Sequence, residues 1–114
     1  MACSWPGVQC GQAGLYWIVT SIDVSNKNLS GPIPASISAL NSLTEFRCAQ
    51  NPLIGGQIHA GLGGIISLQY LDLSYCGLTG ALPSNLQSLK LDTLILNSNK
   101  LTGTLQSTIC SIQS

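Results

Sequence analysis

The sequence predicts an α/β solenoid, a chain that coils about every 24 residues and adds one short strand per coil to a parallel sheet. The 114 residues are 45% hydrophobic and only 7% charged, which is typical of a packed domain and not of a disordered chain. Four segments share one pattern, beginning at Val19, Leu43, Leu68 and Leu91. Each alternates apolar and polar residues and then reaches a glycine, as a strand followed by a turn does.

The four segments agree at several positions counted from their first residue. The fourth position is apolar in each copy: Ile22, Phe46, Leu71 and Leu94. The sixth is also apolar: Val24, Cys48, Leu73 and Leu96. The eleventh is leucine: Leu29, Leu53, Leu78 and Leu101. The thirteenth is glycine: Gly31, Gly55, Gly80 and Gly103. The third copy, LQYLDLSYCGLTGALPSNLQSL, is the most regular, and the second is longer by one residue, which we place in IGGQI.

This unit resembles the plant-specific leucine-rich repeat, LxxLxLxxNxLxGxIPxxLxxL, over about Ile18 to Ile112. The resemblance implies a right-handed solenoid with one parallel strand per repeat on the concave face. Short second strands and 3₁₀ or helical turns would lie on the far side. We expect repeats at about 18–42, 43–67, 68–90 and 91–112, after a cap remnant at 1–17 and without a C-terminal cap. His59 and Gln106 replace the proline of the unit in two copies.

The ninth position of the unit is the asparagine site of the family. Its side chain hydrogen-bonds inward-pointing backbone groups, which are costly to leave unpaired. Asn51 and Asn99 fit this structural ladder, and Cys76 fits the cysteine alternative. Lys27 departs from the pattern, so we expect it to face solvent and the ladder to start at the second coil.

The segment CSWPGVQC resembles the end of the N-terminal cap of the same family, Cys-x-Trp-x-Gly-Val-x-Cys. The resemblance implies a disulfide between Cys3 and Cys10. The alternatives are a metal site, for which histidine partners are lacking, and a redox pair, which favours closer spacing. We expect 12–18 to continue the pattern as an edge strand. Cys110 is either a thiol or paired with sequence beyond this chain.

Outward-facing strand positions form the candidate ligand-binding surface. The charged, aromatic and amide side chains expected there are Asp23, Glu45, Arg47, Tyr70, Asp72, Tyr75, Asp92 and Asn97. Arg47 falls in one column with Asp23 and Asp72 of the neighbouring repeats. Either these charges satisfy one another at the surface, or the face recognises a peptide or glycan.

By resemblance, the leading functional hypothesis is a non-catalytic recognition scaffold for a protein, peptide or glycan, part of a polygalacturonase-inhibitor-like secreted protein or a receptor-like-kinase ectodomain. It would lie outside the cell or at its surface, although the first residues do not read as a signal peptide. Asn28 begins the chain's N-x-S/T glycosylation motif. Further repeats or a partner would cover the last coil.

Other function classes are less favoured. The four basic and four acidic residues cancel, which disfavours nucleic acid as a partner, and no apolar run is long enough to span a membrane. No enzyme, cofactor or metal site is expected, because nucleophile–base sets and ligand clusters are lacking. The alternative is an ice-binding protein. Its hydroxyl row would be Ser30, Thr79, Thr102 and Thr104, interrupted by Ile54.

Overall fold

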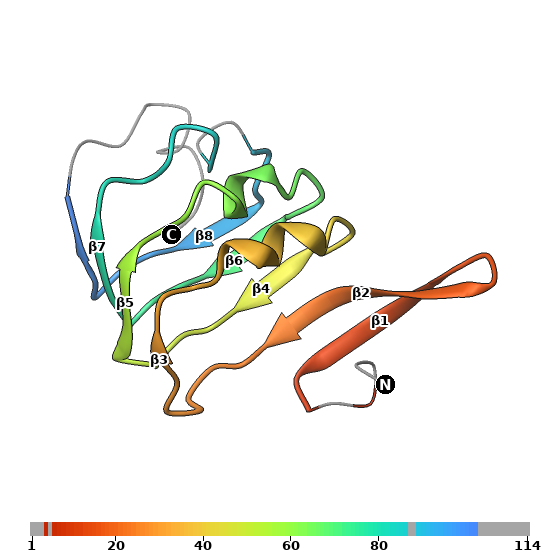
Figure 1. The fold of residues 1–114 in the computed structure, drawn as a ribbon, viewed down its shortest axis with the longest axis horizontal. Coiled ribbons are helices and arrows are strands. Elements are labelled where there is room, and N and C mark those ends of the chain that lie inside the picture. Colours follow the sequence, from red (N-terminus) through yellow and green to blue (C-terminus); the bar gives the residue numbers. More distant parts are fainter. Residues whose placement is uncertain (1–3, 5, 87–88, 103–114) are drawn as a thin grey trace.

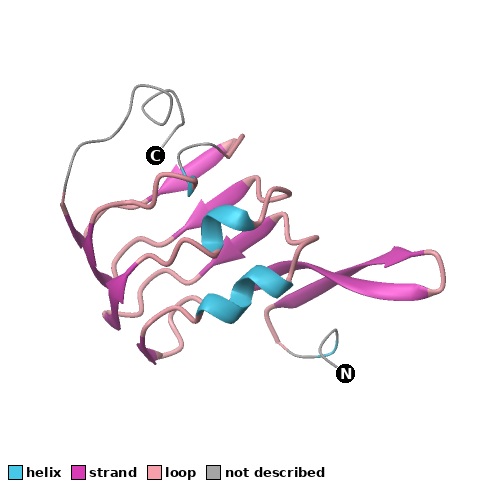
Figure 2. Ribbon diagram, turned by 45° about the horizontal axis from the view of Figure 1, so that its top comes forward, coloured by secondary structure: helices cyan, strands magenta, loops and turns pink. Residues whose placement is uncertain are grey.

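The computed structural model describes residue 4, residues 6–86 and residues 89–102, and it forms a solenoid with two sheets (Figure 1). The larger sheet has the order β1-β2-β4-β6-β8: β1 (Val8–Ala13), β2 (Tyr16–Asp23), β4 (Glu45–Arg47), β6 (Tyr70–Asp72) and β8 (Thr93–Ile95). The smaller has the order β3-β5-β7-β9: β3 (Ser30–Gly31), β5 (Leu53–Gln57), β7 (Gly77–Gly80) and β9 (Lys100–Leu101). Two 3₁₀ helices, η2 (Ala35–Ala39) and η3 (Leu62–Gly64), lie on the return path of the first two coils (Figure 2).

Strands β2, β4, β6 and β8 are parallel and stack the same repeat position from coil to coil. Ile22 is opposite Phe46, Phe46 opposite Leu71, and Leu71 opposite Leu94. The last three side chains are buried in the core between the sheets. This arrangement confirms the predicted leucine-rich-repeat solenoid, because each coil can bury its apolar residues only against its neighbours.

The return paths of the first two coils close with 3₁₀ turns, as expected for this half of the unit. Pro34 precedes η2 in extended conformation, and its carbonyl accepts a hydrogen bond from the Ile37 amide. Ile37 and, in η3, Leu62 are buried and anchor these turns to the core. No helix of the described residues is long and apolar enough to cross a membrane.

Asn51 connects the first two coils from inside the solenoid. Its fully buried side chain accepts hydrogen bonds from the Lys27 and Leu29 amides, both at 3.1 Å. Its Nδ2 lies 2.9–3.2 Å from three carbonyl oxygens, those of Val24, Cys48 and Ala49. The Lys27 side chain is exposed, while its amide is held by the second coil.

Asn99 and Cys76 occupy the equivalent place in later coils. Asn99 Oδ1 accepts from the Leu78 amide, and its Nδ2 donates to Leu73 O at 2.7 Å and Leu96 O at 3.1 Å. The Cys76 thiol donates to Cys48 O at 3.3 Å. The single thiol proton makes fewer backbone contacts than an amide, so this coil relies more on its apolar packing.

The extra residue of the second repeat is Leu53, and this corrects the expected alignment. Leu53 is 62% exposed, whereas Ile54 is 5% exposed and packs in the core. The glycine that turns the coil is therefore Gly56, with φ +76°, which matches Gly80 with φ +76°. A bend at positive φ accepts glycine without steric cost. Leu53, which lies opposite Ser30 in the ladder, faces solvent.

The N-terminal segment forms a β-hairpin, so the expected edge strand over 12–18 is wrong. The edge strand is β1, the chain turns at Gly14 and Leu15, and β2 begins at Tyr16. Gly7, with φ +83°, precedes β1, and its carbonyl accepts the Asp23 amide at 2.7 Å. A Cβ at Gly7 would overlap the Asp23 carbonyl, which explains the glycine of the cap motif.

We predict that Asn51→Ala lowers the free energy of unfolding by about 3–5 kcal/mol, because several buried backbone groups lose their partner. Urea unfolding monitored by circular dichroism measures the loss. Asn41→Ala, which changes an exposed asparagine, is the control and should shift stability by less than about 0.5 kcal/mol. Equal midpoints for the two variants would show that the Asn51 side chain does not hold the coils together.

The corrected alignment makes a second prediction. Ile54→Ala should cost about 2–5 kcal/mol by leaving a core cavity, while Leu53→Ala should cost less than about 1 kcal/mol. The two variants remove similar side chains from adjacent positions, so each controls for the other in the same unfolding experiment. The reverse order of stabilities would restore the alignment with Leu53 inside.

Candidate ligand-binding surface

The outward residues of the four parallel strands form two columns on the concave sheet. The first column runs Ser21, Glu45, Tyr70 and Thr93, and the second runs Asp23, Arg47, Asp72 and Ile95. Most of these side chains are half-buried, because each is flanked by the coils on either side. Five of the eight predicted residues therefore lie on the strands: Asp23, Glu45, Arg47, Tyr70 and Asp72. Asp92 directly precedes β8, and Tyr75 and Asn97 follow β6 and β8.

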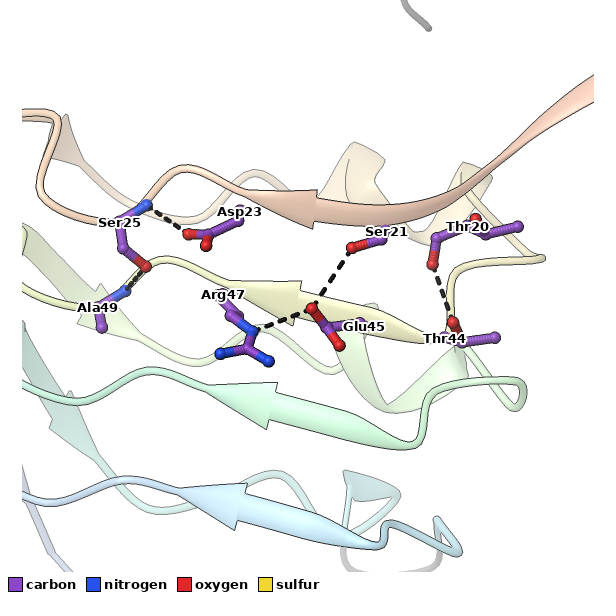
Figure 3. A network of polar contacts seen from close by, with 8 residues as sticks. All are labelled: Thr20, Ser21, Asp23, Ser25, Thr44, Glu45, Arg47 and Ala49. Atoms are coloured by element: carbon purple, nitrogen blue, oxygen red, sulfur yellow. Dashed lines mark hydrogen bonds and ion pairs between the residues drawn. The ribbon is translucent and has the colours of Figure 1, made fainter. Parts of the chain in front are cut away.

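Arg47 is the centre of this surface. Its Nε donates to Glu45 Oε2 at 3.0 Å, and its guanidinium carbon lies 4.1 Å from the centroid of the Tyr70 ring. Ser21 Oγ also lies 3.5 Å from Glu45 Oε2 (Figure 3). The hydrogen bond to Glu45 raises the pKa of Arg47 further, so the group stays charged.

The expected column of Asp23, Arg47 and Asp72 is present in register, yet the ion pair of Arg47 is with Glu45 on its own strand. Asp23 Oδ1 accepts the Ser25 amide at 3.0 Å, and Asp72 Oδ1 accepts the Ser74 amide at 3.0 Å and its hydroxyl at 2.7 Å. These carboxylates shape the turn that follows each strand, as Asx turns do.

Tyr75 has different surroundings from Tyr70. It follows β6 in the left-handed region, with φ 54°, and its side chain is 53% exposed. Gln50 and Ser98 have the same conformation in the adjacent coils and line an open hollow of about 370 Å³ with Tyr75. The two tyrosines predicted as one patch therefore belong to two areas, the sheet and its edge.

The remaining predicted residues are at the far end of the surface. Asp92 is exposed, and its backbone amide donates to Gln69 O at 2.8 Å. Asn97 is exposed, and its Nδ2 lies 3.5 Å from Ser98 Oγ. Both side chains are accessible to a ligand that extends along the strands.

An apolar hollow of about 500 Å³ opens at the first coil. Val24, Leu29, Pro32 and Leu40 are among its lining residues, and they are only partly covered or exposed. We call it the first-coil hollow.

The thiols Cys48 and Cys76 are free and buried, as expected for small core residues. Burial raises the pKa of both, so both are protonated at neutral pH and poor nucleophiles. Cys10 is disulfide-bonded. Cys3 lies outside the described residues, so its pairing with Cys10 stays a prediction, as does the role of Cys110, which is outside them too.

Several smaller expectations also have a place in the structure. Ser30 in β3 and Thr79 in β7 are exposed, as is Thr102 directly after β9, and Thr104 lies outside the described residues. Ile54 does not interrupt this hydroxyl row, because its side chain is buried; the second-coil residues opposite Ser30 and Thr79 are Leu53 and Gln57. The exposed His59 accepts the Gly61 amide through Nδ1 at 2.9 Å. No group of three or more metal-ligating side chains occurs in the part of the chain that the structure describes.

Sequence reasoning missed two features of the surface. The Arg47–Tyr70 stacking could have been inferred from the repeat alignment. Tyr70 lies opposite Glu45 on the neighbouring strand, two residues from the position opposite Arg47, and a long side chain reaches such a diagonal neighbour. The left-handed conformation of Gln50, Tyr75 and Ser98 had no such signal, since these residue types rarely adopt it.

Comparison with known proteins gives consistent results. The Leucine Rich Repeat model matches residues 67–89 and 90–112. Receptor-like protein kinase 7 of Arabidopsis thaliana is 39% identical over 82 residues, covering 71% of this chain and 8% of the kinase. The chain spans only 5–8% of the length of the curated relatives it matches.

Solved structures extend the likeness to nearly the whole chain. The PEPR1–AtPEP1 structure has a TM-score of 0.84 and 32% identity, covering 96% of this chain and 15% of that one. The ectodomain of the Arabidopsis receptor kinase HAESA, solved with an IDA peptide hormone, has a TM-score of 0.80 and 33% identity, covering 94% and 18%. A plant ice-binding protein, with a TM-score of 0.64 and 22% identity over 98% and 44% of the two chains, shares the fold. The repeat model, the kinase relatives and the ectodomain solenoids together show that the chain belongs to the leucine-rich-repeat family, with the repeat type of plant receptor-kinase ectodomains.

Proposed function

We propose that the chain is part of a non-catalytic recognition module that binds a peptide or protein ligand on the concave sheet, outside the cell or at its surface. The observation that carries the proposal is the arrangement of Arg47, Glu45 and Tyr70. It places a charged group and an aromatic ring together, partly exposed, at the centre of the sheet.

The geometry suits a ligand that crosses the strands. Glu45 engages Nε of Arg47, and the hydrogen bonds of the described residues leave both Nη groups without a partner. Stacking on Tyr70 limits the rotamers of the arginine, so little side-chain entropy is lost when a ligand binds. The Nη groups could then donate to a carbonyl or carboxylate of a bound chain.

Similar structures support the peptide class. The name of one of them describes the leucine-rich-repeat ectodomain of the receptor kinase HAESA in complex with an IDA peptide hormone, and another is the PEPR1–AtPEP1 structure. The kinase relatives match this chain over a small share of their length, within the repeat region, so the likeness concerns recognition and not phosphoryl transfer. Ice binding is supported only by the fold likeness and by exposed hydroxyl side chains, whose row carries Leu53 and Gln57 in the second coil.

The expected glycan and disulfide, both features of secreted proteins, are consistent with the same proposal. Asn28 is exposed and has φ 56°, just before β3, so an oligosaccharyltransferase could reach its side chain. Cys10 is disulfide-bonded, which is common in extracellular proteins. We therefore propose a glycan at Asn28 and the Cys3–Cys10 pairing for the secreted form.

A peptide selection tests the recognition surface. Peptides selected from a random display library on this chain should lose affinity about tenfold or more for Arg47→Ala/Tyr70→Ala, because the variant removes the preorganised pair. AtPEP1 and the IDA peptide are defined probes for the same titration. The control is Gln57→Ala/His59→Ala, which changes exposed residues on the far side. Equal affinity of the selected peptides for both variants would remove the concave sheet as the site.

Glycosylation is tested separately. Expression through a eukaryotic secretory pathway should add one N-linked glycan that peptide-N-glycosidase removes, seen as a mass shift. Ser30→Ala should abolish it, and this variant keeps Asn28, whose left-handed backbone a glutamine would strain. Ser36→Ala, at another exposed serine, is the control. A glycan that persists in Ser30→Ala would contradict the assignment to Asn28.

A further inference from the structure

The β1–β2 hairpin has an apolar tip that the concave surface does not use. Leu15, Tyr16 and Trp17 are consecutive and are 95%, 76% and 57% exposed. Figure 1 shows the hairpin extending away from the stacked coils, so the tip is remote from the core. Contiguous exposed apolar side chains of this kind usually mark an interaction surface.

The hairpin also carries the outer edge of the larger sheet. Strand β1 is at one end of the sheet order, and β2 is the element that it contacts among those described. Edge strands usually carry charges, proline or bulges that block further pairing. The residues of β1, VQCGQA, include no charge and no proline, and the register shift lies at Gln9 and Cys10, away from the tip.

The charge distribution favours a second copy of the chain as the partner. No charged side chain occurs before Asp23, so a two-fold axis through the hairpin would bring no like charges together. A strongly charged partner would find no complementary group on this segment. An antiparallel pair of identical strands, by contrast, is self-complementary at every backbone position.

The available area is consistent with this partner. Two aromatic rings and a leucine at these exposures offer about 500 Å² per copy, more than half of the ~800 Å² that each side of a stable interface buries. Pairing of the β1 edges would supply the remainder. Ala13 is opposite Tyr16, and Gly11 is opposite Ile18. Because Gly11 and Ala13 have little or no side chain, they do not cover Ile18 and Tyr16 of β2. A further strand that pairs with β1 could therefore contact these two side chains.

We propose that the hairpins of two copies associate about a two-fold axis, with their β1 strands antiparallel and side by side and the tip residues covering the contact. The larger sheet then continues from one copy into the other. The concave residues around Arg47 stay open on both copies, so this contact is independent of peptide binding.

Sedimentation equilibrium of the whole chain tests the proposal. The native chain should show a concentration-dependent dimer. Ala13→Lys places like charges at the strand contact, and Tyr16→Ser/Trp17→Ser removes the tip. Each variant should weaken the dimer about tenfold or more. Ile66→Ser is the matched control, because Ile66 is 86% exposed and lies outside the hairpin. An unchanged far-UV spectrum and Tm establish that each variant is folded.

Amide hydrogen exchange locates the contact. Exchange over Gly11–Ala13 should slow as the concentration of the native chain rises, and this slowing should be lost in Ala13→Lys. The proposal is overturned if the native chain is a monomer at every concentration. It is also overturned if Ile66→Ser weakens the dimer as much as the hairpin variants do. Protection at Leu29 and Leu40 instead of β1 would place the tip in the first-coil hollow of the partner and would overturn the strand pairing.

Discussion

The structure depends on hydrogen bonding inside the coils, and Asn51 is its clearest instance. A solenoid turns its backbone at every repeat, and each turn directs amides and carbonyls toward an apolar interior. Asn51 is fully buried and contacts backbone groups of both the first and the second coil. Without such a side chain, the leucines could still pack together. The buried amides and carbonyls would then lack hydrogen-bond partners, and this would destabilise the folded coil.

Backbone hydrogen bonds between coils hold the turns that follow the strands. Gln50, Tyr75 and Ser98 have φ between 54° and 61°, a region that most side chains avoid. The Gln50 amide donates to Ser74 O, and the Tyr75 amide donates to Asn97 O, so these two turns are fixed by the next coil. The carboxylates of Asp23 and Asp72 serve these turns also, which leaves Arg47 to pair with Glu45 and stack on Tyr70.

The first four repeat positions of each copy could be predicted well, and the irregular places could not. Alternation placed Phe46, Leu71 and Leu94 in the core because only one face of each strand meets the interior. The extra residue of the second repeat was misplaced, since Leu53 and Ile54 are equally apolar and only the glycine bend selects between them. The hairpin was missed because Gly14 and Leu15 give a weaker turn signal than the apolar run that follows.

By itself the sequence determined the solenoid, its coil length and the columns of the concave sheet. A fixed repeat of inward leucines has no other way to bury them. The tertiary structure decided which charges meet, which tyrosine stacks, and which residues of the hairpin are left exposed. Those outcomes depend on distances between coils and on whether backbone amides or side chains bind the same carboxylates. The sequence of a single repeat predicts neither.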